Sequence, residues 1–257
     1  MMTSLSDQRA ERIATLVGLA RSVITYHRAP ERSAAMDALY AGFIKPGDLA
    51  FDIGSHVGDR IAAFRRLGAR VVAVEPQPGP ASIIEQIFAG DRDVTLLRSA
   101  LGARPGKLVM KINSRNPTVS TASADFVAAA EGAAGWEGQI WDSEIDVPVT
   151  TLDALLARHG RPAFAKIDVE GFEADVLAGL SSPLPALSFE FTTIQRDVAF
   201  ACLARLAALG PYRFNLALGE SQKMALRASV SADDMARHIT SLPHEANSGD
   251  VYALLER

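Results

Sequence analysis

The chain has 257 residues, of which 48% are hydrophobic and 22% are charged, a composition that excludes an intrinsically disordered chain and allows a packed core. A net charge of −4 and a pI near 5.8 provide no basic footprint, so we expect no nucleic-acid partner. No run approaches the roughly 20 apolar residues that span a bilayer, and Cys202 is the single cysteine. We therefore expect a protein without disulfides or a membrane span, in the reducing cytoplasm.

Residues 1–46 are predicted to form helices that precede the core. The first helix mixes acids and arginines with its apolar residues, a pattern typical of an amphipathic helix and not of a signal peptide. We expect it to act as a lid or as a dimer contact, so a homo-oligomer is one expectation. A second helix follows, and Pro46-Gly47 marks the approach to the first strand. We predict a single domain over residues 1–257, with its core in 47–257.

Apolar, strand-like runs alternate with helical runs through most of this core. The first five runs are LAFDI, RIAAFRRLG, RVVAVEP, ASIIEQIFAG and VTLLRSA, and alternation resumes after residue 150 and continues to DVYALLE. Nearly continuous apolar strands separated by helices predict a mostly parallel sheet covered on both faces, which is a doubly wound α/β fold. Residues 106–150 break the alternation and are predicted to form a short hairpin and a loop insertion that contacts the substrate.

The turn FDIGSHVG follows the first predicted strand and has the features of a nucleotide-cofactor loop. Glycines at 54 and 58 allow the backbone to approach a ligand, and the following helix N-terminus favours acceptor groups. The spacing is Gly-x-x-x-Gly and not the Gly-x-Gly-x-x-Gly of dinucleotide-binding proteins. Asp52 at the strand end would repel a phosphate and suit a cationic cofactor. S-adenosylmethionine fits, because it carries an ammonium and a sulfonium and no phosphate.

A second acid, Glu75, ends the next predicted strand, VVAVEP. In a parallel sheet this position lies beside the glycine turn, where two carboxylate oxygens can accept hydrogen bonds from both ribose hydroxyls. The pair Asp52 and Glu75 therefore predicts adenosine recognition. The alternative for either acid alone is that it caps the helix after its strand.

Five segments occur in a fixed order between about residues 50 and 192: FDIGSHVG, VEPQP, SALG, VPVTTLDALL and KIDVEGFEADVLAGL. Together they resemble the FkbM family of S-adenosylmethionine-dependent methyltransferases, and KIDVEGFEADVLAGL is the most specific of them. The resemblance implies a class I methyltransferase, Rossmann-like fold of seven strands with a reversed final hairpin. It also implies O-methylation of a hydroxyl on a small molecule, sugar, glycan or natural product, with S-adenosylhomocysteine as the product.

The resemblance also implies a set of cofactor-binding positions. These are Asp52, Gly54 and Gly58 at the methionine end, Glu75 at the ribose, Ser99 and Ala100 near the adenine, and Asp168 closing the pocket from the fourth core strand. Ser55 and His56 belong to the same loop, where relatives commonly carry Ala-Asn. Histidine can supply a hydrogen bond in that place.

Three residues are candidates for the chemistry of methyl transfer. Asp168 and Glu170 lie two residues apart in KIDVEGF, which puts both carboxylates at the ligand-binding edge of the sheet. Either could act as the base that takes the proton of the acceptor, and His56 is the other base candidate. A divalent metal held by these two acids and Glu190 is less favoured, because they lack a fixed-spacing ligand motif. The alternative for Glu170 is that it only forms the turn and caps the next helix.

Two other functions compete with this prediction, and two further features of the sequence are open to interpretation. A catalytically silent cofactor-binding or assembly module is the main alternative, and a nicotinamide-dependent oxidoreductase is a weaker one because the third glycine is missing. Trp136 and Trp141 lie in the insertion, where they would form a platform for a sugar or ring or would pack against the sheet. Cys202 lies in the apolar run AFACLARLAALG and is predicted to be a small core residue.

Overall fold

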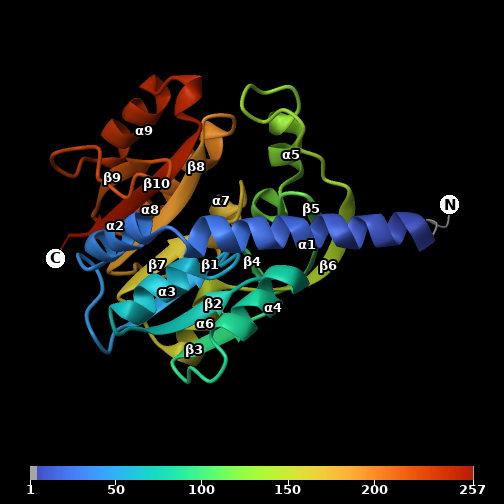
Figure 1. Ribbon diagram of the computed structural model, residues 1–257. Helices are drawn as coiled ribbons and strands as arrows, with labels where there is room; N and C mark the ends of the chain where they lie inside the picture. The colour runs from blue at the N-terminus through green and yellow to red at the C-terminus, as the bar shows by residue number, and fades with distance from the viewer. Residues whose placement is uncertain (1–4, 257) are drawn as a thin grey trace.

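The computed structural model describes residues 5–256, which form a seven-stranded sheet with helices on both faces and a separate three-stranded sheet (Figure 1). The α-helices are α1 Leu5–His27, α2 Pro30–Tyr40, α3 Asp59–Arg66, α4 Pro78–Ile87, α5 Ala124–Ala130, α6 Leu152–His159, α7 Glu173–Ala178, α8 Arg196–Leu209 and α9 Ala232–Ser241. The strands are β1 Leu49–Ile53, β2 Arg70–Val74, β3 Val94–Leu97, β4 Ala100–Leu101, β5 Gly106–Ile112, β6 Ser143–Thr150, β7 Phe164–Ile167, β8 Ala186–Thr192, β9 Tyr212–Leu218 and β10 Ser248–Leu255. Two 3-10 helices are η1 Pro117–Val119 and η2 His244–Ala246.

The large sheet has the strand order β3-β2-β1-β7-β8-β10-β9. Every pairing from β3 to β8 is parallel, and β10 runs antiparallel to both of its neighbours. This arrangement confirms the predicted doubly wound, mostly parallel seven-stranded α/β fold with a reversed final hairpin. Because the order changes direction beside β1, the loops after β1 and β7 diverge there and leave room for a ligand.

Two apolar clusters, one on each face of the sheet, form the core. One packs α6, α7, α8 and α9 against the sheet, and the other packs α2, α3 and α4 against it. All five residues of β1 and all four of β7 are buried, as expected for strands covered on both faces. Cys202 is fully buried in the first cluster, and burial raises the pKa of its thiol, so its environment is that of a core residue.

The insertion supplies β5 and β6 of the three-stranded sheet, whose order is β4-β6-β5. Strands β5 and β6 pair antiparallel, so the predicted hairpin is present, with η1 and α5 in its long connection. One expected strand, VTLLRSA, is divided. Its first part is β3 of the large sheet, whereas Ala100 pairs with Val149 of the insertion. The division carries the chain from the large sheet to the insertion directly beside the ligand edge.

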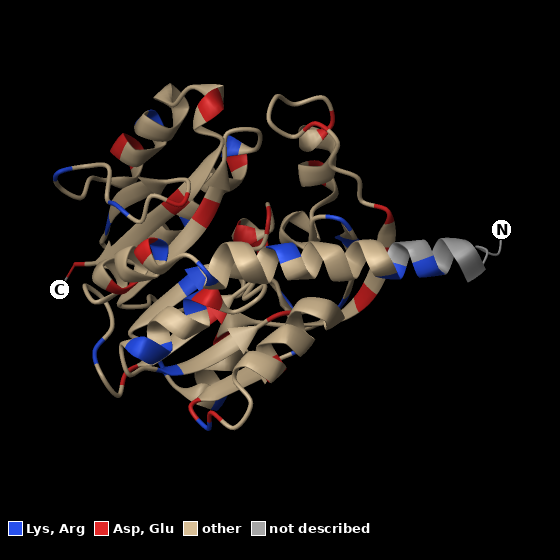
Figure 2. Cartoon of the chain, in the orientation of Figure 1, with Lys and Arg blue, Asp and Glu red and all other residues tan. Residues whose placement is uncertain are grey.

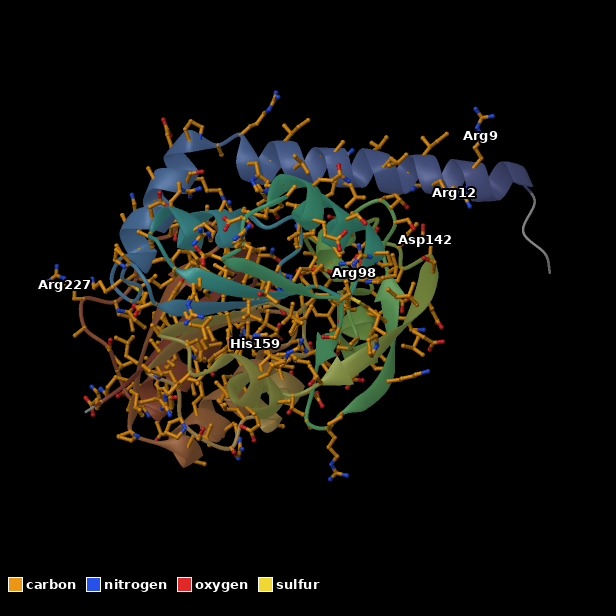
Figure 3. All side chains as sticks on the ribbon, turned by 90° about the horizontal axis from the view of Figure 1, so that it is seen from below. Arg9, Arg12, Arg98, Asp142, His159 and Arg227 are labelled. Atoms are coloured by element: carbon orange, nitrogen blue, oxygen red, sulfur yellow. The ribbon has the colours of Figure 1, made fainter. Side chains whose placement is uncertain are left out.

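Helix α1 lies against α4 and η1, and its N-terminal end extends beyond the rest of the structure (Figure 1). Figure 3 shows Arg9 on this extending end, pointing away from the body. Figure 2 shows acidic and basic positions interspersed over the ribbon. None of the helices in residues 5–256 is both long enough and apolar enough to cross a membrane.

Candidate active site

A cavity of about 290 Å³ opens at the carboxyl ends of β1, β2, β7 and β8. Its floor is the turn after β1 and the loop after β7, and the insertion and the end of α1 form its walls. Ligands of open α/β sheets bind at this edge. The structure therefore brings residues from the cofactor loop, the KIDVEGF segment and the insertion around one cavity.

The turn after β1 holds its glycines for different reasons. Gly54 has φ 80°, and a Cβ on it would lie 1.7 Å from the carbonyl oxygen of Asp168, so only glycine lets the ends of β1 and β7 approach. Gly58 caps α3 at φ 83° and faces Phe88 of the core. Unlike Gly54, Gly58 does not line the cavity.

Ser55 and His56 complete the turn with different roles. The Ser55 hydroxyl donates to the carbonyl oxygen of Asp52 at 2.7 Å, so it is used to close the turn. His56 has φ 46°, in the left-handed region that asparagine and histidine tolerate better than most residues. This conformation gives a physical reason why histidine can occupy this position of the turn.

The ring of His56 is enclosed in the cavity wall. It packs edge-on against Tyr26, with 5.5 Å between ring centroids, and its Nε2 lies 3.4 Å from the Thr118 hydroxyl. Burial lowers the pKa of His56 to about 4. The imidazole is therefore neutral at pH 7 and is a weak base.

Asp52 is 2% exposed at the end of β1, and its Oδ2 has no hydrogen-bond partner within residues 5–256. Burial, and then the charge of Asp59, raise the pKa of Asp52 to about 7, while Lys166 opposes the rise. A buried carboxylate oxygen without a donor is costly. A cationic or hydrogen-bonding ligand group in the cavity would remove this cost.

Glu75 lies at the end of β2 and is also 2% exposed. Its Oε2 accepts from the backbone N–H of His56, and its Oε1 accepts from the backbone N–H of Gln77, both at 2.8 Å. Burial raises the pKa of Glu75 to about 8, although these two bonds favour the charged form. Each oxygen retains a second acceptor position, so the carboxylate can bind a pair of hydroxyls.

The expected adenine residues, Ser99 and Ala100, line the cavity next to Gln77. Both follow Arg98, where the chain crosses from β3 to β4. The Gln77 side chain donates to the carbonyl oxygen of Pro117 at 3.1 Å, which links this side of the cavity to the insertion.

Sequence reasoning missed four residues that line the opposite end of the cavity: Tyr26, Asp59, Arg60 and Glu220. Asp59 accepts from Arg60 at 2.6 Å, and Arg60 also pairs with Glu220 at 3.1 Å. Burial would raise the pKa of Asp59, but the two arginines beside it hold that pKa well below its usual range. Asp59 and Arg60 directly follow Gly58 of the cofactor loop, and this position in the sequence could have indicated that they line the cavity. Tyr26 and Glu220 are distant in sequence, so no local pattern indicates them.

Asp168 follows β7 and is held by a buried lysine. Lys166 Nζ donates to Asp168 Oδ2 at 2.9 Å and to Asp250 Oδ1 at 2.7 Å. Burial would lower the pKa of Lys166, but these two carboxylates raise it well above its ordinary value. Burial would raise the pKa of Asp168, but the neighbouring Lys166 outweighs burial, so the pKa of Asp168 lies below its ordinary value. Lys166 and Asp168 are therefore an ion pair at neutral pH.

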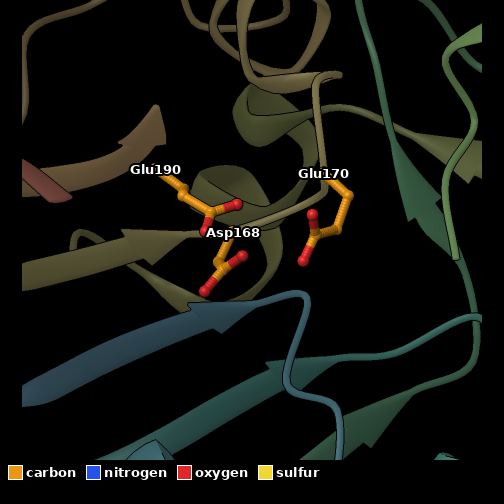
Figure 4. A group of neighbouring side chains, drawn as sticks. All are labelled: Asp168, Glu170 and Glu190. Carbon is orange, nitrogen blue, oxygen red and sulfur yellow. The ribbon is translucent and has the colours of Figure 1, made fainter. Parts of the chain in front are cut away.

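Glu170 and Glu190 face Asp168 across the end of the sheet (Figure 4). One carboxylate oxygen of each of the three residues lies within 4.8 Å of the other two. Burial, followed by the charge of Asp168, raises the pKa of both glutamates well above the ordinary value. The structure thus brings Glu190 of β8 to the two acids of the KIDVEGF segment.

The insertion provides an apolar wall near these acids. Trp136 is 7% exposed and lines the cavity, and its ring nitrogen donates to Asn247 at 3.1 Å. Met110, Val119 and Phe172 line the same cavity. Trp141 does not line it and donates to the carbonyl oxygen of Val119 at 2.9 Å. The two tryptophans therefore differ: Trp136 is available to a ligand and Trp141 supports the wall.

S-adenosylmethionine matches the polar groups of this cavity. Its ammonium and its ribose hydroxyls are hydrogen-bond donors, and the buried Asp52 Oδ2 lacks a donor. Glu75 offers one further acceptor position on each oxygen, beside the turn where Gly54 keeps the backbone close to β7. The residues present fit the cofactor that the sequence predicted.

Comparisons with solved structures give similarities of low sequence identity. A TehB-like SAM-dependent methyltransferase of Corynebacterium glutamicum is 10% identical, with a TM-score of 0.45 and coverage of 92% of this chain and 99% of that one. The precorrin-6y C5,15-methyltransferase of Geobacter metallireducens is 13% identical, with a TM-score of 0.43 and coverage of 87% of each chain.

Sequence comparisons identify the family. A curated relative, the 31-O-demethyl-FK506 methyltransferase FkbM of Streptomyces tacrolimicus, is 29% identical over 158 residues, which cover 53% of this chain and 61% of the relative. The match therefore spans less than two-thirds of that relative's length. The methyltransferase FkbM domain family matches residues 52–204, more than half of the chain. The glycine turn, Glu75 and the KIDVEGF segment all lie within this match, and the chain belongs to the FkbM methyltransferase domain family.

Proposed function

We propose that this protein is an S-adenosylmethionine-dependent O-methyltransferase acting on a hydroxyl of a small molecule or sugar. The observation that carries the proposal is that two groups of acids line the same cavity. Asp52 and Glu75 lie at one part of the sheet edge, and the carboxyl groups of Asp168, Glu170 and Glu190 lie at another. The name of the relative from Streptomyces describes methylation of an O-demethyl compound, which supports an oxygen acceptor.

The cofactor residues have separate tasks in this proposal. Asp52 accepts from the ammonium of the methionine moiety, Glu75 accepts from the two ribose hydroxyls, and Gly54 allows close approach of the backbone. When bound, S-adenosylmethionine supplies a methyl group whose carbon–sulfur electron pair stays on sulfur as the new carbon–oxygen bond forms. The chain must then align the acceptor at ~3–3.5 Å from the methyl carbon and take its proton.

Glu170 is the first candidate for the proton acceptor. Its raised pKa makes its carboxylate a better base than the ion-paired Asp168 or the neutral His56. Asp168 orients the acceptor through the oxygen that Lys166 does not occupy. His56 remains the second base candidate, weakened by its pKa of about 4.

The cavity also suggests which acceptors bind. Among residues 5–256, one lysine and one arginine line the cavity. Both of them, Lys166 and Arg60, are already paired with acids. A phosphorylated or carboxylated acceptor would meet unpaired carboxyl groups, whereas a neutral hydroxylated molecule can donate to them. Trp136 and its apolar neighbours suit a ring or hydrocarbon face.

Binding and transfer can be tested in sequence. Calorimetry should show binding of S-adenosylmethionine and S-adenosylhomocysteine but not of NAD. Incubation with methyl-labelled cofactor and a panel of neutral hydroxylated acceptors should then transfer label to oxygen. Absence of binding of both cofactor forms would overturn the proposal. Binding without transfer to any acceptor would favour the catalytically silent module.

A further inference from the structure

Three carboxyl groups converge at the ends of β7 and β8 without enough positive charge around them. One oxygen each of Asp168, Glu170 and Glu190 lies within 4.8 Å of the others, and Figure 4 shows the carboxyl groups turned toward a common space. Among described residues, the Glu190 carboxyl hydrogen-bonds Asp168, and its Oε2 is buried without a partner. This arrangement requires a proton or a cation between the acids.

Glu170 provides a separate sign of a ligand. It is 7% exposed, and no donor in residues 5–256 hydrogen-bonds its carboxylate. Its backbone is held at φ 56°, and the Glu173 side chain accepts from the N–H groups of Val169 at 2.9 Å and Gly171 at 3.4 Å. Hydrogen bonds to Glu173 of α7 therefore fix the backbone of the turn, while the Glu170 side chain lines the cavity and receives no hydrogen bond from the described residues.

The nearby cations are already occupied. Lys166 is shared between Asp168 and Asp250, at 2.9 and 2.7 Å. Arg60 is paired with Asp59 and Glu220. Neither pairs with Glu170 or Glu190, and the attraction that Lys166 exerts on both through space is outweighed by burial and by the charge of Asp168.

We propose that Asp168, Glu170 and Glu190 bind one hard divalent cation, Mg²⁺ or Mn²⁺. The cluster offers three carboxylate oxygens and contains no cysteine or histidine. Carboxylate oxygens are the ligands that these ions prefer. Around one octahedral Mg²⁺, oxygens at ~2.1 Å from the ion lie ~3.0 Å apart when adjacent and ~4.2 Å apart when opposite. The three carboxylates, which already lie within 4.8 Å of one another, therefore close around the ion by side-chain rotation. The cation replaces the proton between Asp168 and Glu190.

The remaining coordination positions of the cation face the cavity and bind oxygens of the acceptor. This role for the cation rests on the proposed function. A cation there lowers the pKa of a bound hydroxyl and fixes its position. Each acid binds through one oxygen, so the second oxygen of Glu170 is left to accept the hydroxyl proton. The preferred acceptor class is then a molecule with two neighbouring oxygens, such as a vicinal diol, that chelates the cation.

The test is a Mn²⁺ titration of the full chain, without cofactor or acceptor, followed by electron paramagnetic resonance of free Mn²⁺. We expect one bound Mn²⁺ per chain, displaced by Mg²⁺. Glu170→Gln and Glu190→Gln should each weaken binding at least about tenfold. Glu245→Gln, the same change at an exposed residue, should leave it unaltered. Melting curves of all three variants verify that they are folded.

Two results would overturn the site: no Mn²⁺ binding by the folded wild type at millimolar metal, or equal binding by wild type and both cluster variants. Calorimetry of S-adenosylmethionine without metal separates this outcome from failure of the proposed function. Cofactor binding without Mn²⁺ binding rejects the metal site alone. Mn²⁺ binding without cofactor binding rejects the proposed function and leaves the metal site in place.

Discussion

The two ends of the cavity are built in different ways. At the end proposed to bind the cofactor, here the cofactor end, Asp52, Glu75 and the turn between β1 and α3 lie within 24 consecutive residues, and backbone N–H groups fix the Glu75 carboxylate. At the end proposed to bind the acceptor, here the acceptor end, the acids come from β8 and the loop after β7, and the apolar wall comes mainly from the insertion. A local turn therefore specifies the first end, whereas the second depends on packing of distant segments.

The largest expected effect is on turnover, and it tests whether the acceptor end can be changed without changing cofactor binding. Glu170→Gln should lower turnover about a thousandfold, because a positioned base contributes about 10²–10⁴ in rate. Cofactor affinity, measured by calorimetry, should stay within about threefold of wild type, since Glu170 lies at the acceptor end. A parallel loss of cofactor affinity and turnover would show that the two ends are not separable. Glu245→Gln is the control at an exposed site.

The next prediction concerns Gly54, where the ends of β1 and β7 come together, and the free energy of unfolding. Gly54→Ala should lower the free energy of unfolding by about 3 kcal/mol or more, from the left-handed backbone and from a Cβ forced against the end of β7. Gly90 has a similar φ of 82° but nothing within 4 Å of its added Cβ. Gly90→Ala should therefore cost only about 1 kcal/mol. Equal losses in urea unfolding would remove the close approach as the reason for Gly54.

The cofactor end can then be tested alone. Glu75→Ala should weaken S-adenosylmethionine binding about a hundredfold, because the two hydrogen bonds from the ribose hydroxyls are lost. The exposed Glu131→Ala is the control and should bind normally in the same calorimeter. Retention of normal affinity by Glu75→Ala would reject the ribose assignment, whatever the acceptor end does.

The last effect concerns pH and the enclosed His56 ring, and within one pH unit it is the smallest of the four. Its pKa is about 4 in the folded chain and ordinarily 6.5, so the unfolded chain takes up the proton first as the pH falls. The stabilising contribution is complete above pH 6.5 and is lost as the pH falls toward 4. Wild type should therefore lose about 1.4 kcal/mol per pH unit more than His56→Asn within this window. Parallel stability profiles in urea would show that His56 is not buried as a neutral ring.

The sequence by itself determined the features that local physics controls. Continuous apolar strands between helices predicted the sheet, and the acid and glycines after the first strand predicted the turn that Gly54 makes against β7. Glu75 lies beside that turn because adjacent parallel strands end at the same edge. The motifs also indicated the family that the comparisons show.

Only the tertiary structure decided which distant groups meet. It divided VTLLRSA between two sheets, turned Gly58 toward the core, and placed Tyr26 and Glu220 at the cavity. It also brought Glu190 to Glu170 and Asp168 and exposed Trp136, but not Trp141, to the cavity. Such contacts depend on strand order and helix packing over the whole chain, and a short segment carries no information about them because its own backbone does not form them.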